Sequence, residues 1–157
     1  MKTSIHTPIP ERLYSKILNA VPILAIDVVF LNKEKTKTLL FKRTNEPLKG
    51  VYFTMGGRLL KNEKILDGAV RQSLREAGIR INKKKLIFGG IQEEIHTTSV
   101  FKGISYHAVV LYYGYIINEK KEIILDSQHT MFAWLPVSSE KIHPLIRKKL
   151  RNILKNI

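Results

Sequence analysis

Five residues with a fixed spacing mark one segment of the chain as a place where chemistry could occur. They are a glycine, a glutamate, an arginine, a second glutamate and a second glycine: Gly57, Glu63, Arg71, Glu76 and Gly78. Carboxylate oxygens are hard ligands of the kind that Mg²⁺ requires, and guanidinium groups match phosphate oxygens in charge and shape. Because residues four apart lie on one side of a helix, a helix here would gather such groups.

The residues around this spacing predict that helix. Asn62 can cap its start, and Gly78 stands where a helix C-terminus needs a left-handed residue, so we expect it to end at about Ala77. Its apolar face is predicted to consist of Leu66, Ala69, Val70, Ser73, Leu74 and Ala77. The charged and amide side chains, Arg71, Gln72, Arg75 and Glu76, should project from the other side.

The remaining elements are predicted from hydrophobic periodicity and turn residues. A helix should follow Pro10 with Leu13 and Ile17 on its apolar side, and residues 23–31 and 38–41 should form a hairpin. Short strands are expected near 51–55, 86–95, 106–116 and 131–136. From about Ser138 we predict a basic helix with an apolar stripe, Ile142, Ile146, Leu150, Ile153 and Ile157. This order of elements favours one layered domain, residues 1–157, with a mixed sheet between helices.

The composition limits the class of protein. Twenty-seven Lys and Arg against 13 Asp and Glu give a formal charge of +14, which favours polyanionic partners such as nucleotides. Cysteine is absent, which excludes disulfides and thiolate chemistry. The first residues carry charges where a signal peptide needs an apolar run, and no run is long enough to span a bilayer. We therefore expect a soluble, cytoplasmic protein without a membrane partner.

The chain resembles a known family over most of its length. The segment 57–79 has the intervals of the Nudix box, and RTNEPLKGVYFTMGGR (43–58) is similar to the stretch before the box in GDP-mannose mannosyl hydrolases. DSQHTMFAWL (126–135) resembles their C-terminal active-site strand. Together with PILAIDVVF (22–30), the likeness covers most of residues 22–135. The resemblance implies an α+β fold, the Nudix-type α/β/α sandwich with a mixed sheet. It also implies a hydrolase of a nucleoside-diphosphate sugar, commonly a homodimer.

Two departures from the usual box bear on mechanism. Gln72 and Arg75 stand where the common box has carboxylates, which should leave room for one metal ion rather than several. The GDP-mannose branch also lacks those carboxylates, although its replacements differ. One ion suits attack by water on the anomeric carbon better than attack on phosphorus, because the whole nucleoside diphosphate then leaves. The sequence leaves the roles of Gln72 and Arg75 open.

The resemblance also assigns roles to individual residues. Glu76, Gln128 and the carbonyl of Gly56 would ligate Mg²⁺, with Mn²⁺ as the alternative ion, and His129 would be the catalytic base. Three arginines would contact substrate or diphosphate during catalysis: Arg43, Arg58 and Arg71. Asp27 and either Tyr106 or His107 would lie near the sugar. His96 is not assigned, since Glu94 fits the register better, and the C-terminal lysines are expected to be solvated.

Alternatives remain for residues and for function. Arg71 could hold a glutamate by ion pairing, as in ordinary boxes, instead of contacting phosphate. A diphosphatase that cleaves the P–O–P bond would fit the same family. A Nudix-fold module that only binds a nucleotide or RNA would explain the missing carboxylates, but the chain shows no RNA-binding signature with interleaved aromatics, so a nucleic-acid partner is not expected.

Overall fold

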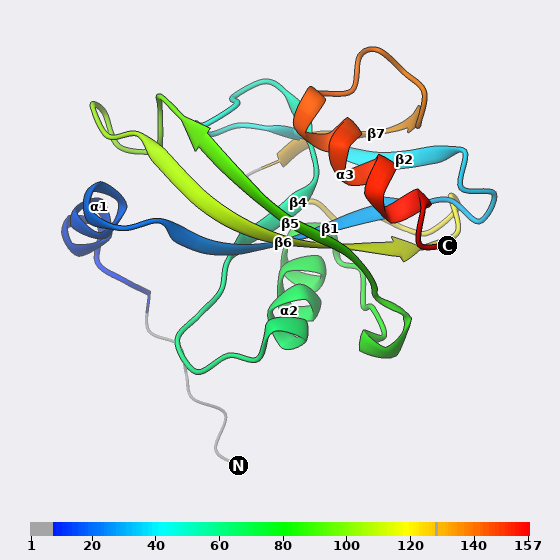
Figure 1. Ribbon diagram of the computed structural model, residues 1–157, viewed down its shortest axis with the longest axis horizontal. Helices are drawn as coiled ribbons and strands as arrows, with labels where there is room; N and C mark the ends of the chain where they lie inside the picture. The colour runs from blue at the N-terminus through cyan, green and yellow to red at the C-terminus, as the bar shows by residue number, and fades with distance from the viewer. Residues whose placement is uncertain (1–7, 128) are drawn as a thin grey trace.

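A mixed β-sheet between two helices forms the body of the protein (Figure 1). The computed structural model describes residues 8–127 and 129–157. Its strands are β1 (Ile23–Leu31), β2 (Lys37–Arg43), β3 (Tyr52–Phe53), β4 (Met55–Arg58), β5 (Ile87–His96), β6 (Tyr106–Ile116) and β7 (His129–Pro136). Its helices are α1 (Glu11–Ala20), α2 (Ile65–Ala77), the short 3₁₀ helix η1 (Lys83–Lys85) and α3 (Pro144–Leu154).

The sheet order is β3-β2-β1-β6-β5, with β4 paired to β1 and β7 paired to β2. Strands β1 and β6 run parallel, and the other pairs run antiparallel. The predicted hairpin is confirmed, because Phe30 pairs with Leu39 beside the turn. The predicted α+β fold with a mixed sheet is confirmed as well.

Alternation along β1 creates two hydrophobic cores, because successive strand residues point to opposite faces. Ile26, Val28 and Phe30 belong to the core beneath α2. Val29 and Leu31 belong to the core beneath α3. The helices α2 and α3 therefore cover opposite faces of the sheet, and by the same alternation Asp27 lies on the α3 face.

The predicted helix of the box is present, with two corrections. Gly78 takes the left-handed conformation (φ 65°) at its C-terminus, as predicted. Asn62 does not cap the helix: it lies in the preceding turn, and Lys64 is the N-cap residue without a side-chain hydrogen bond. The buried side also differs, since Leu74 is 43% exposed whereas Gln72 and Glu76 are buried. Both polar residues belong to a stripe at helical spacing that faces the sheet.

The terminal helices also differ from expectation. In α1, Leu18 is buried and Leu13 is exposed, so the buried side is rotated from the predicted one. The C-terminal helix starts at Pro144 rather than near Ser138, because a turn occupies the intervening residues. Most of its predicted apolar stripe is buried, but Ile157 lies beyond the helix end and is 38% exposed.

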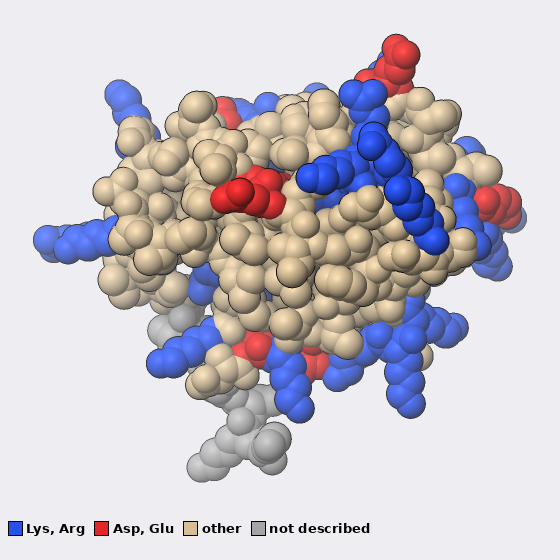
Figure 2. Space-filling model, in the orientation of Figure 1, with Lys and Arg blue, Asp and Glu red and all other residues tan. Residues whose placement is uncertain are grey.

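The prediction that the C-terminal lysines are solvated is wrong for one of them. Lys149 has no exposed surface, because it lies three residues after Ile146 and four before Ile153 on the buried stripe. Other basic side chains remain outside, and Figure 2 shows Lys and Arg gathered over the region of α3. Within residues 8–127 and 129–157, none of the helices has the length and apolar character needed to cross a bilayer.

Candidate active site

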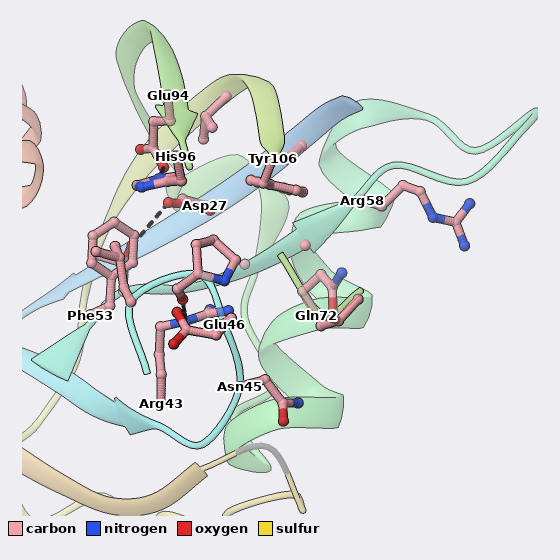
Figure 3. A pocket seen from close by; sticks show the side chains of 18 of the residues that line it. Asp27, Arg43, Asn45, Glu46, Phe53, Arg58, Gln72, Glu94, His96 and Tyr106 are labelled. Atoms are coloured by element: carbon pink, nitrogen blue, oxygen red, sulfur yellow. Dashed lines mark hydrogen bonds and ion pairs between the residues drawn. The ribbon is translucent and has the colours of Figure 1, made fainter. Parts of the chain in front are cut away.

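One cavity of about 320 Å³ brings together most of the residues proposed from the resemblance (Figure 3). Its lining includes Asp27, Arg43, Gly56, Arg58, Arg71 and Tyr106. These residues come from β1, β2, β4, α2 and β6, so the sheet and the box helix jointly position them. Glu76 and His129 lie outside the lining, and Gln128 lies outside the described residues.

Glu76 is a buried carboxylate with few compensating partners. It is 1% exposed, and its Oε2 accepts a hydrogen bond of 3.2 Å from the backbone nitrogen of Gly56. Arg75 lies 3.3 Å from its Oε1. Burial raises the pKa of Glu76 to about 7, with Asp126 adding to the effect and Arg75 opposing it. A positive charge beside this carboxylate would favour its ionised form.

The geometry of Gly56 makes its carbonyl available on the same side. Leu59 donates to the carbonyl of Leu24, so the antiparallel β1–β4 ladder places Gly56 and Asp27 at a position without mutual hydrogen bonds. The backbone groups of Gly56 therefore point away from β1, consistent with its nitrogen binding Glu76. A side chain there would displace its neighbours, because a Cβ on Gly56 would lie 1.9 Å from Asp27 Oδ1.

Gln72 stands one helical turn before Glu76 and also lines the cavity. It is 2% exposed, and its Oε1 is buried with no hydrogen-bond partner among the described residues. Buried polar atoms are normally paired, so an orphaned amide oxygen points to a missing ligand atom. The absence of a side chain at Gly57 leaves room for the Gln72 amide, because a Cβ on Gly57 would lie 2.1 Å from Gln72 Nε2.

These oxygens fit a hard divalent cation. The ligands available within the described residues would be the Glu76 carboxylate, the Gln72 amide oxygen and the Gly56 carbonyl. No group of three or more His, Cys, Asp or Glu side chains in the described part of the chain is arranged to hold a metal ion. A metal here would therefore depend on amide and carbonyl oxygens besides one carboxylate.

Arg71 is engaged within the box itself. Its Nε lies 2.6 Å from Glu63 Oε1, and its Nη2 donates to Glu63 Oε2 (2.9 Å) and to the carbonyl of Arg58 (3.1 Å). Arg71 therefore links the loop before α2, through Glu63, to the backbone of β4, through Arg58. This is the ion-pairing role that the sequence left open, and contact between Arg71 and phosphate stays a prediction.

The other two arginines are held less tightly. Arg43 Nε donates to the carbonyl of Pro47 (2.9 Å), which anchors the loop 44–50 at the cavity rim. The guanidinium of Arg58 lies over the ring of Tyr14, 5.5 Å from its centroid. Both arginines line the cavity together with Arg75, whose side chain is 52% exposed.

His129 begins β7 beside Arg43, with which it is paired in register. Its Nδ1 lies 2.8 Å from Asp126 Oδ1, and its ring packs edge-on against Phe41. A carboxylate on Nδ1 fixes the tautomer and leaves Nε2 as the nitrogen that can accept a proton. Asp126 was not singled out from the sequence, although its spacing of three from His129 was a usable signal.

One end of the cavity contains a charge cluster that sequence reasoning missed. Lys149 Nζ lies 2.5 Å from Asp27 Oδ2 and 2.7 Å from Glu94 Oε1. Burial opposes ionisation of Glu94, but the neighbouring His96 and the bound Lys149 outweigh it and hold its pKa at about 2. Burial likewise lowers the pKa of Lys149, but the two carboxylates outweigh that effect and raise it.

Tyr106 and His96 complete this end of the cavity, where Figure 3 shows them beside Glu94 and Asp27. Their rings stack with centroids 6.3 Å apart. Burial raises the pKa of Tyr106, so its hydroxyl stays protonated at neutral pH. His107, the alternative to Tyr106, instead pairs with the exposed Glu93 at 2.8 Å and is not part of the cavity lining.

The sequence of this chain is similar to those of known proteins. A family model of the NUDIX domain matches residues 21–157. The low-salt glycan biosynthesis protein Agl8 of Haloferax volcanii is 28% identical over 145 residues, which cover 92% of this chain and 90% of that protein.

Solved structures show the same fold. A MutT protein from Methanosarcina mazei Go1 has a TM-score of 0.65 and 18% identity, over 87% of this chain and 96% of that one. A bifunctional NMN adenylyltransferase/ADP ribose pyrophosphatase from Francisella tularensis, solved with AMP and a manganese ion, has a TM-score of 0.66 and 16% identity. That match covers 92% of this chain but 44% of the longer bifunctional protein. Since the family model matches nearly the whole sequence after α1, the chain belongs to the NUDIX domain family, the Nudix hydrolase superfamily.

Proposed function

We propose that this Nudix hydrolase cleaves a nucleoside-diphosphate sugar, similar to GDP-mannose, into free sugar and nucleoside diphosphate. The observation that carries the proposal is the mixed lining of the cavity. Arg43 and Arg58 belong to this lining, and so do the buried carboxylates of Asp27 and Glu94. A diphosphate suits the arginines, because guanidinium groups bind phosphate oxygens in pairs. A neutral group rich in hydroxyls suits the carboxylates.

In this proposal water attacks the anomeric carbon. His129 Nε2 takes a proton from the water while the new carbon–oxygen bond forms. The bond between that carbon and the diphosphate oxygen breaks, and its electron pair leaves with the diphosphate. Asp126 holds the imidazole in the required tautomer through Nδ1. Arg43 and Arg58 stabilise the charge that develops on the leaving diphosphate.

One Mg²⁺ ion, or Mn²⁺ in its place, is proposed beside Glu76, where it would neutralise the leaving diphosphate. The raised pKa of Glu76 and the orphaned Gln72 Oε1 support this place. Gln128 remains a proposed ligand by resemblance. A crystal grown with Mg²⁺ and a nucleoside diphosphate should show one ion touching Glu76 and the Gly56 carbonyl. Two or more ions clustered on α2 would contradict the proposal.

Attack at phosphorus is the second candidate, and one observation favours it. A carboxyl group with a pKa of about 7 can itself accept a proton at neutral pH, so Glu76 could serve as base for a diphosphatase. Incubation with a panel of nucleotide sugars and a divalent cation in ¹⁸O-water separates the two reactions. Label in the sugar supports attack at carbon, and label in phosphate supports the diphosphatase. No turnover of any substrate, with retained affinity, would support a binding module.

Two further properties are proposed from the resemblance alone. We expect a homodimer, which light scattering on the purified protein would measure as about twice the chain mass of 18.1 kDa. We also expect the protein in the cytoplasmic fraction of its cells, which immunoblotting after fractionation would test.

A further inference from the structure

Lys149 is an unusual residue for the middle of a helix that packs on a sheet. It has no exposed surface, and its Nζ lies 5.1 Å from the ring centroid of Phe53 and 5.9 Å from that of Tyr112. Removing a charged group from water costs several kcal/mol, about as much as its partners can return. Packing alone would be served equally well by leucine or methionine at this position. The reason for a charged residue at this position therefore lies in the groups that it binds.

Those groups are two carboxylates from different strands. Asp27 lies on β1 and Glu94 on β5, and Lys149 Nζ bridges one oxygen of each. The neighbouring donors bind the same two oxygens: Thr54 donates to Asp27 Oδ2 (2.9 Å) and Gln92 donates to Glu94 Oε1 (3.1 Å). Lys149, Thr54 and Gln92 thus share one oxygen of each carboxylate.

Each carboxylate has a second oxygen besides the one that Lys149 binds, and the cavity adjoins both side chains. Asp27 and Glu94 both line it, and so do His96 and Tyr106 beside them (Figure 3). Asp27 Oδ1 adjoins Gly56, and Glu94 Oε2 lies 3.7 Å from His96 Nε2. Lys149 itself is not part of the lining, so it can act on a ligand only through the carboxylates that it holds.

The charges of this cluster select the chemistry of a ligand. Carboxylate oxygens only accept hydrogen bonds, so they suit hydroxyl donors and repel a second anion. Two acceptors that the same ammonium group holds together can bind two hydroxyl groups of one ring. The arginines of the lining, by contrast, suit the diphosphate.

We propose that Lys149 is a positioning residue for the glycosyl group. By binding one oxygen each of Asp27 and Glu94, it fixes their other oxygens to accept hydrogen bonds from two hydroxyls of a neutral sugar. The inference rests on the proposed function. It assigns to the Asp27 and Glu94 carboxylates the selection of a polyhydroxyl ring over a group without hydroxyls.

The test is equilibrium binding, measured by calorimetry with Mg²⁺ at neutral pH. The probe is a nucleoside-diphosphate hexose in which carbon replaces both the glycosidic and the phosphorus-bridging oxygens, so neither bond can be cleaved. The reference ligand is the same nucleoside methylenediphosphonate without the hexose. The wild type should prefer the hexose probe by roughly 10–100-fold, the range expected for one or two hydrogen bonds to charged groups.

The variant is Lys149→Met, which keeps the length of the side chain and removes its charge. The preference for the hexose probe should fall below about threefold, while affinity for the reference ligand changes by less than about twofold. Lys148→Met is the matched control, since its side chain is the exposed neighbour on α3, and it should keep the full preference. A merely structural role for Lys149 would weaken both ligands alike, which would overturn the inference. So would a Lys149→Met protein that retains the wild-type preference.

A second variant covers the case in which Lys149→Met does not fold. Glu94→Gln leaves Lys149 paired with Asp27 and should lower the preference for the hexose by about tenfold. An unchanged preference in Glu94→Gln would also overturn the inference. The ¹⁸O experiment tests the proposed hydrolysis separately. A wild type that prefers the hexose but hydrolyses no nucleotide sugar would refute the proposed function and leave the role of Lys149 standing.

Discussion

Substitution of Glu76 by glutamine in the metal-free protein tests how ionisation of this buried carboxylate affects the stability of the fold. Glu76 is 1% exposed, and its pKa is raised from the ordinary 4.5 to about 7, chiefly by burial. The folded state therefore binds this proton more tightly than the unfolded state does. Stability from this group is complete below pH 4.5 and is lost as the pH rises to about 7.

The size of the effect follows from the two pKa values. Each pKa unit corresponds to about 1.4 kcal/mol, so the wild type should lose about 3 kcal/mol of unfolding free energy across this window. Glu76→Gln carries a neutral amide of the same shape and escapes that loss. Above about pH 7, the metal-free variant should be more stable than the wild type by about 3 kcal/mol, whereas the two should be nearly equal at pH 4.5.

Urea unfolding in the presence of a chelator, repeated from pH 4.5 to 8, measures this difference. Groups shared by the two proteins contribute equally and cancel in the comparison. Glu140→Gln is the control, because this exposed carboxylate should leave the pH dependence of the wild type unchanged. Mg²⁺ should then stabilise the wild type above pH 7 more than the variant, since it binds the ionised carboxylate. Equal stability of wild type and Glu76→Gln at pH 8 without metal would refute the reasoning.

Three further substitutions test the site and its frame. His129→Gln should lower turnover by ~10²–10⁴-fold and leave nucleotide affinity nearly intact; full turnover in this variant would exclude the imidazole as base. Gly56→Ala should destabilise the protein by about 1–3 kcal/mol, because the new Cβ would lie 1.9 Å from Asp27 Oδ1 and 2.5 Å from the carbonyl of Ile26; an unchanged urea midpoint would contradict the close packing. Gly78→Ala should cost about 1 kcal/mol, since its φ of 65° is strained for alanine, and a neutral result in thermal unfolding would contradict the left-handed cap.

The sequence by itself determined the order and type of the main elements. Alternating or continuous apolar runs placed the long strands, and β6 has the predicted bounds, Tyr106–Ile116. Gly78 ended the box helix as predicted, because few other residues tolerate a left-handed conformation. These features depend on local periodicity and on the backbone preferences of single residues, and both can be recognised in one sequence.

The spacing of the box and its flanking segments also determined the family. Most of the residues that resemblance alone selected meet in the cavity, where the structure brings Asp27, Arg43, Arg58, Arg71 and Tyr106 to one place. The resemblance could not show that Arg71 pairs with Glu63, because this pairing depends on the distance between a loop and a helix. Their catalytic and binding roles stay predictions.

Only the tertiary structure decided which polar residues lie inside. Gln72, Glu76 and Lys149 occupy the buried stripes of their helices, where a purely apolar pattern excludes them. Periodicity places a residue on a helix face, but burial of its charge requires partners that come from distant strands. Asp27 and Glu94 lie 122 and 55 positions before Lys149, and nothing local in the sequence joins them. The sheet joins them because β6 lies between β1 and β5, and α3 crosses the face to which Asp27 points.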